Sequence, residues 1–138
     1  MYHRVGQYPG ARRLVELAAR FQLAPSHEGY ATSPWEATVP LFQPPLAAVF
    51  PGEWTYAILT AIWANGTIPP HQDGDPERSG AQRFHLVLQS NPQSWTLHDG
   101  TWQQLTEDGI YTMDPIKTHA AVNWGGEPRI HLVVDVRR

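Results

Sequence analysis

From Trp54 onward the chain consists of short strand-like runs with turn residues between them and no helical pattern. Asn65-Gly66 and Asp99-Gly100 are strong hairpin signals. The chain holds 13 prolines and 11 glycines, which divide it into short segments as an all-β fold requires. About eight strands without an intervening helix fit a jelly roll or an antiparallel barrel. We expect these strands over residues 54–64, 67–73, 82–89, 94–98, 101–105, 109–113, 119–124 and 129–136.

The N-terminal part has one convincing helical pattern, over residues 11–23. We expect this helix to pack across the outside of a sheet, since its apolar residues recur at three- and four-residue spacing. They are Leu14, Leu17, Ala18 and Phe21. Residues 24–53 are proline-rich, and we expect at most a short strand or one turn of helix there. The chain should form a single domain, residues 1–138, in which residues 1–53 support a jelly-roll catalytic core over residues 54–138.

The composition narrows the classes of partner and location. The formal net charge is −3, so nothing favours nucleic acid or an anionic membrane as a partner. The apolar runs are far shorter than the roughly 20 residues that a membrane helix needs, and the N-terminus shows no secretory signal. We therefore expect a cytoplasmic protein with neither nucleic acid nor membrane as partner. The chain has no cysteine, so any metal must be held by His, Asp or Glu side chains.

His71 and Asp73 are separated by one residue. On an extended segment such residues point to the same face, so both side chains can reach one ion. His119 is the best candidate for a third ligand. Two imidazoles and one carboxylate on one face of a metal leave three positions open, as in non-haem Fe(II) oxygenases.

Arg83 and His85 repeat this spacing in the next strand, where the alternate residues are apolar. Arg129 likewise begins a strand that otherwise resembles a core segment. An arginine on so apolar a strand is costly unless it pairs with an anion, and no obvious buried acids match both. Two such arginines suggest a bound dianion, because the guanidinium fork suits a carboxylate. The alternative is that each arginine lies at a rim and reaches solvent.

Taken in order, these motifs resemble the aspartyl/asparaginyl β-hydroxylase-type 2-oxoglutarate dioxygenases. The stretch LTAIWANGTIPPH also resembles that family's approach to its first iron histidine, and the similarity covers roughly residues 55–136. The matching pieces are His71-Gln72-Asp73, Arg83-Phe84-His85-Leu86, Asp114 to His119, Arg129 and Val134-Asp135.

The resemblance implies a cupin-like double-stranded β-helix whose mouth holds Fe(II), 2-oxoglutarate and O2. It implies that His71 and His119 are iron ligands and that Arg129 binds the distal carboxylate of 2-oxoglutarate. Arg83 with His85 would bind the C1 end of the cosubstrate. Thr60 matches a hydroxyl-bearing cosubstrate contact of the family.

Asp73 stands where the family's animal peptide hydroxylases have glycine, and it completes a triad as in the free-amino-acid hydroxylases. A complete triad argues against halogenation, because a halogenase leaves the coordination position of this carboxylate open for a halide ion.

The remaining histidines and acids have other expected roles. His131, where the family usually has an aliphatic residue, is either a core histidine bonded to a neighbouring strand or a contact near the pocket floor. Asp114 is expected to fix a turn or orient a ligand, and Asp75 lies too far along its loop to replace Asp73. His98 is interpreted as a turn residue, and His3 and His27 are placed outside the barrel.

The expected activity is hydroxylation of an aliphatic C–H bond, with release of succinate and CO2. The substrate is an amino acid, a small metabolite or a peptide side chain. Two alternatives remain open: a cupin-type metalloenzyme that does not use 2-oxoglutarate, and a non-catalytic jelly-roll ligand-binding protein. The N-terminal segment makes only a thin lid, so the pocket either stays open or is completed by the second subunit of a homodimer.

Overall fold

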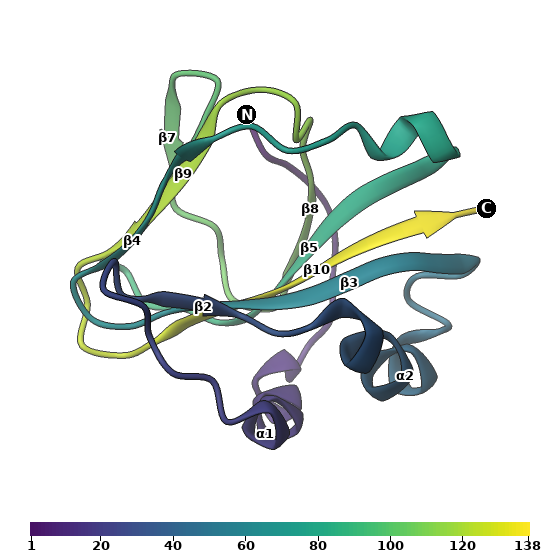
Figure 1. Cartoon of the computed structure of the whole chain (residues 1–138), viewed down its shortest axis with the longest axis horizontal. Coiled ribbons are helices and arrows are strands. Elements are labelled where there is room, and N and C mark those ends of the chain that lie inside the picture. Colours follow the sequence, from purple (N-terminus) through teal and green to yellow (C-terminus); the bar gives the residue numbers. More distant parts are fainter.

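Two antiparallel sheets face each other in the computed structural model, which describes residues 1–138, and the helices lie on the outer side of the larger sheet (Figure 1). The six-stranded sheet has the order β1-β8-β5-β10-β3-β2, and the four-stranded sheet has the order β4-β9-β6-β7. The strands are β1 His3–Gln7, β2 Tyr30–Thr32, β3 Glu53–Ile62, β4 Gly66–His71, β5 Ala81–Gln89, β6 Ser94–His98, β7 Thr101–Gln103, β8 Gly109–Thr112, β9 His119–Asn123 and β10 Arg129–Arg137.

All eight strands predicted after Trp54 are present, as β3 to β10. Both predicted turns form, but only Asp99-Gly100 makes a hairpin, between β6 and β7, whereas Asn65-Gly66 leads from β3 in the larger sheet to β4 in the smaller one. Asn65 has a φ of 64°, and Asp99 and Gly100 have φ values of 48° and 84°, the positive values that tight hairpins require. No helix interrupts these strands except the 3₁₀ turn η3, Pro76–Ser79, in the loop after β4.

The predicted helix over residues 11–23 is present as three consecutive short segments. They are the 3₁₀ turn η1 Ala11–Leu14, the α-helix α1 Val15–Ala18 and the 3₁₀ turn η2 Ala19–Phe21. Leu14 and Ala18 from the predicted apolar face are buried against the larger sheet. The helix therefore packs where the sequence placed it, but it ends at Phe21 instead of residue 23.

Residues 24–53 were expected to hold at most a short strand or one turn of helix. This prediction is wrong, because the segment forms the 12-residue helix α2, Trp35–Leu46, in addition to the short strand β2. Prolines at positions 40, 44 and 45 lie inside it, and each removes one backbone donor. Tertiary packing compensates, since Phe42 and Leu46 are completely buried beneath the sheet. Helical stability in proteins comes mostly from such packing, which a propensity argument cannot include.

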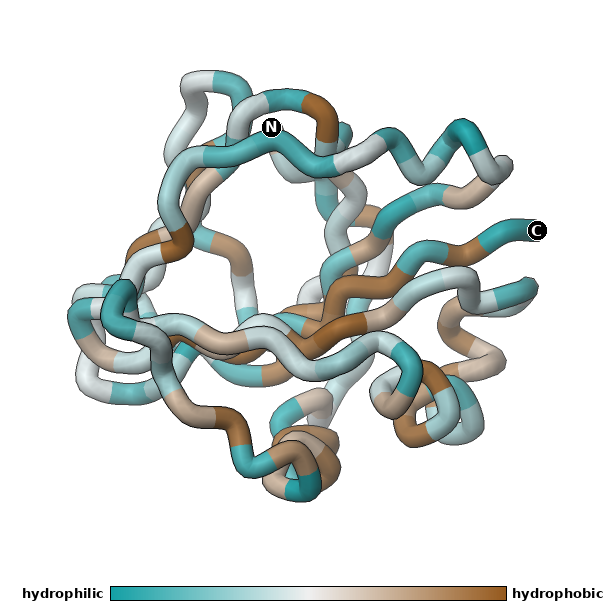
Figure 2. Tube along the Cα trace, viewed as in Figure 1, coloured by the Kyte–Doolittle hydropathy of each residue, from teal (hydrophilic) through white to brown (hydrophobic).

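The largest hydrophobic core lies between the six-stranded sheet and the helices. On β10, Ile130, Leu132 and Val134 belong to this core, whereas the alternate residues Arg129 and His131 do not. Figure 2 shows hydrophobic residues along the strands of this sheet and in the helices below it. Polar side chains such as Arg83, His85 and Arg129 consequently point to the other side of this sheet, where they line a cavity. None of the helices is long and apolar enough to cross a lipid bilayer.

Candidate active site

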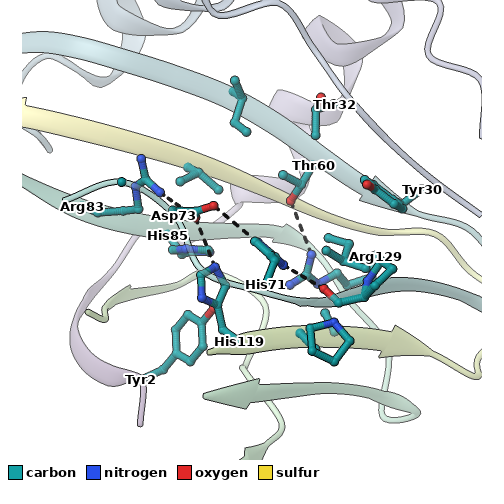
Figure 3. Close-up of a pocket in the computed structure, with 18 of the residues that line it drawn as sticks. Tyr2, Tyr30, Thr32, Thr60, His71, Asp73, Arg83, His85, His119 and Arg129 are labelled. Carbon is teal, nitrogen blue, oxygen red and sulfur yellow. Dashed lines mark hydrogen bonds and ion pairs between the residues drawn. The ribbon is translucent and has the colours of Figure 1, made fainter. Parts of the chain in front are cut away.

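A cavity of about 530 Å³ opens between the two sheets, at the mouth of the barrel (Figure 3). It receives side chains from both sheets and from the segment before β1. All seven site residues predicted from the sequence line it together. They are Thr60, His71, Asp73, Arg83, His85, His119 and Arg129.

His71, Asp73 and His119 form a cluster at one side of this cavity, and their potential ligand atoms all lie within 4.8 Å of one another. His71 ends β4 and His119 begins β9, and the two residues are direct partners in the antiparallel register. Asp73 follows β4, and its backbone N–H donates to the carbonyl of Pro115 over 2.9 Å. The cluster thus brings His119 to Asp73, which precedes it in the chain by 46 positions.

Each histidine of the cluster has its ring fixed by a backbone carbonyl. Nδ1 of His71 lies 2.8 Å from the Pro69 carbonyl, and Nδ1 of His119 lies 2.8 Å from the Lys117 carbonyl. A carbonyl only accepts, so both Nδ1 atoms carry hydrogen and both neutral rings present a bare Nε2. These Nε2 atoms lie 3.5 Å and 3.1 Å from the Asp73 carboxylate.

Bare nitrogen and carboxylate oxygen are all acceptors, so their convergence requires a proton or a cation between them. Backbone carbonyls placed in this way orient metal-binding histidines in proteins. Nitrogen and oxygen ligand atoms suit Fe, Zn, Mn and related divalent ions. Two histidines with one carboxylate leave further coordination positions of the metal free. The residues present therefore fit a metal ion.

Arg83 binds two acids, whereas the sequence showed no obvious buried acids that would match both arginines. Its Nε and Nη2 donate to the two oxygens of Asp135 over 2.7 Å and 2.9 Å, and its Nη1 donates to Asp73 over 2.9 Å. Asp135 on β10 is the register partner of Arg83 on β5, a pairing that the sequence alone does not reveal. Burial opposes the charge, but these acids raise the pKa of Arg83 above its usual value.

The Asp73 carboxylate is held ionised by its neighbours. Burial alone would raise its pKa, but the close approach of His119 and the charge of Arg83 outweigh burial and lower the pKa below its usual value. Arg83 therefore connects the cluster to the buried Asp135, and it orients the oxygen that faces His119.

Arg129 differs from Arg83 because no carboxylate pairs with it. The residue is 4% exposed, and its only side-chain partner is the hydroxyl of Thr60, 3.4 Å from Nη1. Burial lowers the pKa of Arg129 to about 10, so the guanidinium stays charged at neutral pH. An unpaired buried cation facing a cavity is costly unless an anion binds there. Of the two arginines that suggested a bound dianion, only Arg129 therefore lacks an acid in the protein.

His85 and His131 form a buried pair across β5 and β10. Their Nδ1 atoms are 3.2 Å apart, so one ring donates to the other. Burial and the nearby charge of Arg129 lower the pKa of both residues well below the usual value, so both rings are neutral. His131 is thus bonded to a neighbouring strand, and the residue that it contacts lines the cavity.

His98 is not a turn residue, as the sequence suggested, but the buried last residue of β6. It is the register partner of His119, and its Nε2 donates to the carbonyl of Asp114 over 2.8 Å. The side chain of Asp114 accepts from the backbone of Ile116 and fixes that turn, as expected. Strand pairing buries His98, and no local pattern in the sequence carries that information.

Three tyrosines that the sequence did not single out also line the cavity: Tyr2, Tyr30 and Tyr56. Tyr30 comes from β2 and Tyr56 from β3, and the Arg83 guanidinium lies 5.5 Å from the Tyr56 ring centre. Tyr2 precedes β1 and is almost fully buried. Their position follows from strand order, since β1 and β2 are the two edges of the larger sheet.

Two sheets around a cavity that holds a His–Asp–His cluster define a cupin-type double-stranded β-helix with a candidate metal centre. A double-stranded β-helix protein from Klebsiella pneumoniae superposes with a TM-score of 0.56 and 17% identity, covering 86% of this chain and 84% of that one. The protein TT1209 from Thermus thermophilus superposes with a TM-score of 0.54 and 16% identity, covering 88% of this chain and 94% of that one. The cupin domain of an XRE family transcriptional regulator from Enterobacter cloacae superposes with a TM-score of 0.53 and 13% identity, covering 80% of this chain and 98% of that one. The predicted fold class is confirmed.

The family model of aspartyl/asparaginyl beta-hydroxylases matches residues 29–138. The chain therefore belongs to the aspartyl/asparaginyl beta-hydroxylase family, and the resemblance inferred from the motifs is confirmed. This membership and the fold together support a hydroxylase on a cupin-type barrel. Residues 1–28, which include β1, lie outside the matched region.

Proposed function

We propose that this protein is an Fe(II)- and 2-oxoglutarate-dependent dioxygenase that hydroxylates an aliphatic C–H bond and releases succinate and CO2. One observation carries the proposal: a buried arginine without an acidic partner shares a cavity with a His–Asp–His cluster. The cluster accounts for a metal, and Arg129 accounts for a carboxylate-bearing cosubstrate.

His71, Asp73 and His119 would hold the iron, with Arg83 keeping the Asp73 carboxylate in place. When bound, the iron would supply the oxygen chemistry that couples decarboxylation of 2-oxoglutarate to hydroxylation. The protein would supply ligands on one side of the iron only, and it would hold the substrate carbon in position.

Arg129 and Thr60 would bind the distal carboxylate of 2-oxoglutarate, because the guanidinium retains free N–H donors at the buried end of the cavity. His85 would contact the C1 end. Arg83 uses three of its N–H groups on Asp135 and Asp73, so it would contribute to that end chiefly through its charge and its remaining donors.

The rest of the wall would receive the substrate. It carries hydroxyl and apolar groups without a further charge: Tyr30, Thr32, Tyr56, Ile58, Ile68, Pro69 and Pro70. An amino acid, a small metabolite or a peptide side chain would fit a cavity of about 530 Å³. The proposal places the protein among cytoplasmic enzymes, with no nucleic acid or membrane partner and with a homodimer as one arrangement of its subunits.

The decisive test is succinate formation by purified protein with Fe(II), 2-oxoglutarate and oxygen, with candidate amino acids and short peptides added in turn. His71→Ala should abolish this turnover, whereas His27→Ala should leave it unchanged because the His27 side chain is 91% exposed and lies outside the cavity. Turnover that survives His71→Ala would refute the iron assignment.

Binding of 2-oxoglutarate separates the proposal from its two alternatives. If the protein is a 2-oxoglutarate-dependent dioxygenase, Arg129→Met should abolish that binding. In a cupin-type metalloenzyme that uses no 2-oxoglutarate, the substitution should be irrelevant to activity. In a non-catalytic jelly-roll binding protein, removing the metal should change neither stability nor ligand binding.

A further inference from the structure

The phenol of Tyr2 is a polar group without a partner inside the candidate site. Tyr2 is 4% exposed, and its side chain lines the cavity. Its hydroxyl makes no hydrogen bond within the protein, although its backbone makes two. Figure 3 shows Tyr2 among the residues that line the cavity. Tyr2 reaches the site from the segment before β1, far along the chain from the site residues that the sequence predicted.

The backbone of Tyr2 is held firmly enough to fix the phenol. The side chain of Gln103 on β7 accepts from the Tyr2 N–H over 2.7 Å and donates to the Tyr2 carbonyl over 3.1 Å. The next residue, His3, begins the pairing of β1 with β8. Tyr2 is therefore tied to both sheets, since β8 belongs to the larger and β7 to the smaller.

The ring of Tyr2 packs edge-on against two histidines of the site. Its centre lies 5.2 Å from that of His85, at 89°, and 5.6 Å from that of His98, at 68°. Burial raises the pKa of the Tyr2 hydroxyl to about 12, so the group keeps its proton at physiological pH. A phenol that is protonated, nearly buried and unpartnered is available as a hydrogen-bond donor to an acceptor in the cavity.

We propose that Tyr2 is a cosubstrate-binding residue, whose hydroxyl donates a hydrogen bond to the carboxylate at the C1 end of 2-oxoglutarate, beside His85. The inference rests on the proposed function and adds to it a binding group supplied by the N-terminal segment. We assign Tyr2 to this end because its ring packs against His85, whereas the distal carboxylate is assigned to Arg129 and Thr60, which contact each other.

The experiment measures binding by calorimetry, without turnover, to the full chain loaded with Co(II) under anaerobic conditions. Tyr2→Phe keeps the ring and its packing but removes the hydroxyl. Loss of one hydrogen bond to a charged group should weaken 2-oxoglutarate binding about tenfold. Tyr8→Phe is the matched control, because Tyr8 lies in the same N-terminal segment but packs against the core outside the cavity. It should leave the affinity unchanged.

A second ligand tests which end is bound. 2-Oxobutyrate keeps the C1 carboxylate and the keto group but lacks the distal carboxylate. Tyr2→Phe should weaken both ligands by the same factor, whereas Arg129→Met should affect 2-oxoglutarate alone. A Tyr2→Phe effect confined to 2-oxoglutarate would overturn the assignment to the C1 end.

Failure of the inference is distinguishable from failure of the proposed function. If wild type binds 2-oxoglutarate and Tyr2→Phe binds it equally well, the Tyr2 assignment is wrong and the proposed function stands. If metal-loaded wild type does not bind 2-oxoglutarate, the proposed function and the Tyr2 assignment both fall. Unchanged Co(II) affinity in Tyr2→Phe is expected and shows that the variant is folded at the metal centre.

Discussion

Arg83 and Arg129 are both buried arginines of one cavity, but they have opposite roles in stability. Arg83 neutralises Asp135, which is 5% exposed, and it also pairs with Asp73. Arg129 has no acid to neutralise and contacts only Thr60. The first residue therefore contributes to folding, and the second imposes a cost that a bound anion would relieve.

This contrast predicts opposite signs for the same substitution. In the metal-free protein, Arg83→Met should lower the free energy of unfolding by about 3–5 kcal/mol, because it leaves Asp135 buried and unpaired. Arg129→Met should raise the free energy of unfolding by about 1–4 kcal/mol, because it removes an unpaired buried charge. Urea titration of the two variants and wild type provides the measurement. Equal destabilisation by both substitutions would show that Arg129 has a structural partner.

The His85–His131 pair predicts a specific dependence of stability on pH. The pKa of His131 is depressed in the folded state by burial, by Arg129 and by His85, whereas the unfolded chain titrates near the ordinary value of 6.5. Below that pH the unfolded state binds more protons, so stability is complete above about pH 6.5 and is lost as the pH falls. Each such histidine contributes up to about 1.4 kcal/mol per pH unit.

His131→Leu should therefore flatten the slope of unfolding free energy against pH by up to about 1.4 kcal/mol per unit below pH 6.5. His27→Leu serves as the control, since its side chain is 91% exposed. Chemical denaturation of the metal-free protein at several pH values gives the slopes. A slope unchanged by His131→Leu would contradict the depressed pKa.

At the scale of elements, the backbone just before strand β1 is hydrogen-bonded to the smaller sheet through one side chain. Gln103 on β7 makes both contacts to the backbone of Tyr2, and no strand pairing joins β1 to β7. Gln103 is thus a positioning residue for Tyr2, although it does not line the cavity.

Gln103→Leu should free the start of β1 and weaken 2-oxoglutarate binding by a factor of about three to ten, as two hydrogen bonds of ordinary strength are lost. Gln103→Glu keeps the acceptor for the Tyr2 N–H, so its affinity for 2-oxoglutarate should lie between those of Gln103→Leu and wild type. Hydrogen exchange at the β1 amides should accelerate in the same order. Normal exchange in β1 together with normal affinity in Gln103→Leu would remove Gln103 from this role.

For the whole molecule, the proposed binding of a metal at the cluster would raise the global stability. A ligand that binds only the folded state stabilises it by about 2.7 kcal/mol at a free concentration about 100 times its Kd. Co(II) or Fe(II) should therefore raise the Tm, and a chelator should reverse the rise. His119→Ala should abolish this shift, while His3→Ala, at an exposed position, should preserve it. A metal-independent Tm in wild type would mean that the cluster binds no ion under these conditions.

Much of the fold could be predicted from the chain because its signals are local. Two-residue alternation on β5 and β10 separates core residues from cavity residues, and hairpin pairs such as Asp99-Gly100 give the turns. The His–Asp–His cluster could be predicted because His71 and Asp73 are two residues apart and only His119 had to be found at a distance. Helix α2 could not, because burial of Phe42 and Leu46 outweighs the prolines in its sequence.

The remaining features of the site follow from long-range register, which no local pattern encodes. The pairing of β5 with β10 brings Asp135 to Arg83 and leaves Arg129 without an acid. The pairing of β1 with β8 inserts Tyr2 into the cavity from the other end of the chain. Residue spacing and the family resemblance were therefore sufficient to identify seven side chains that line the cavity, although not its three tyrosines. Strand order and packing decided which of their charges are neutralised, because a partner is set by distance in space and not along the sequence.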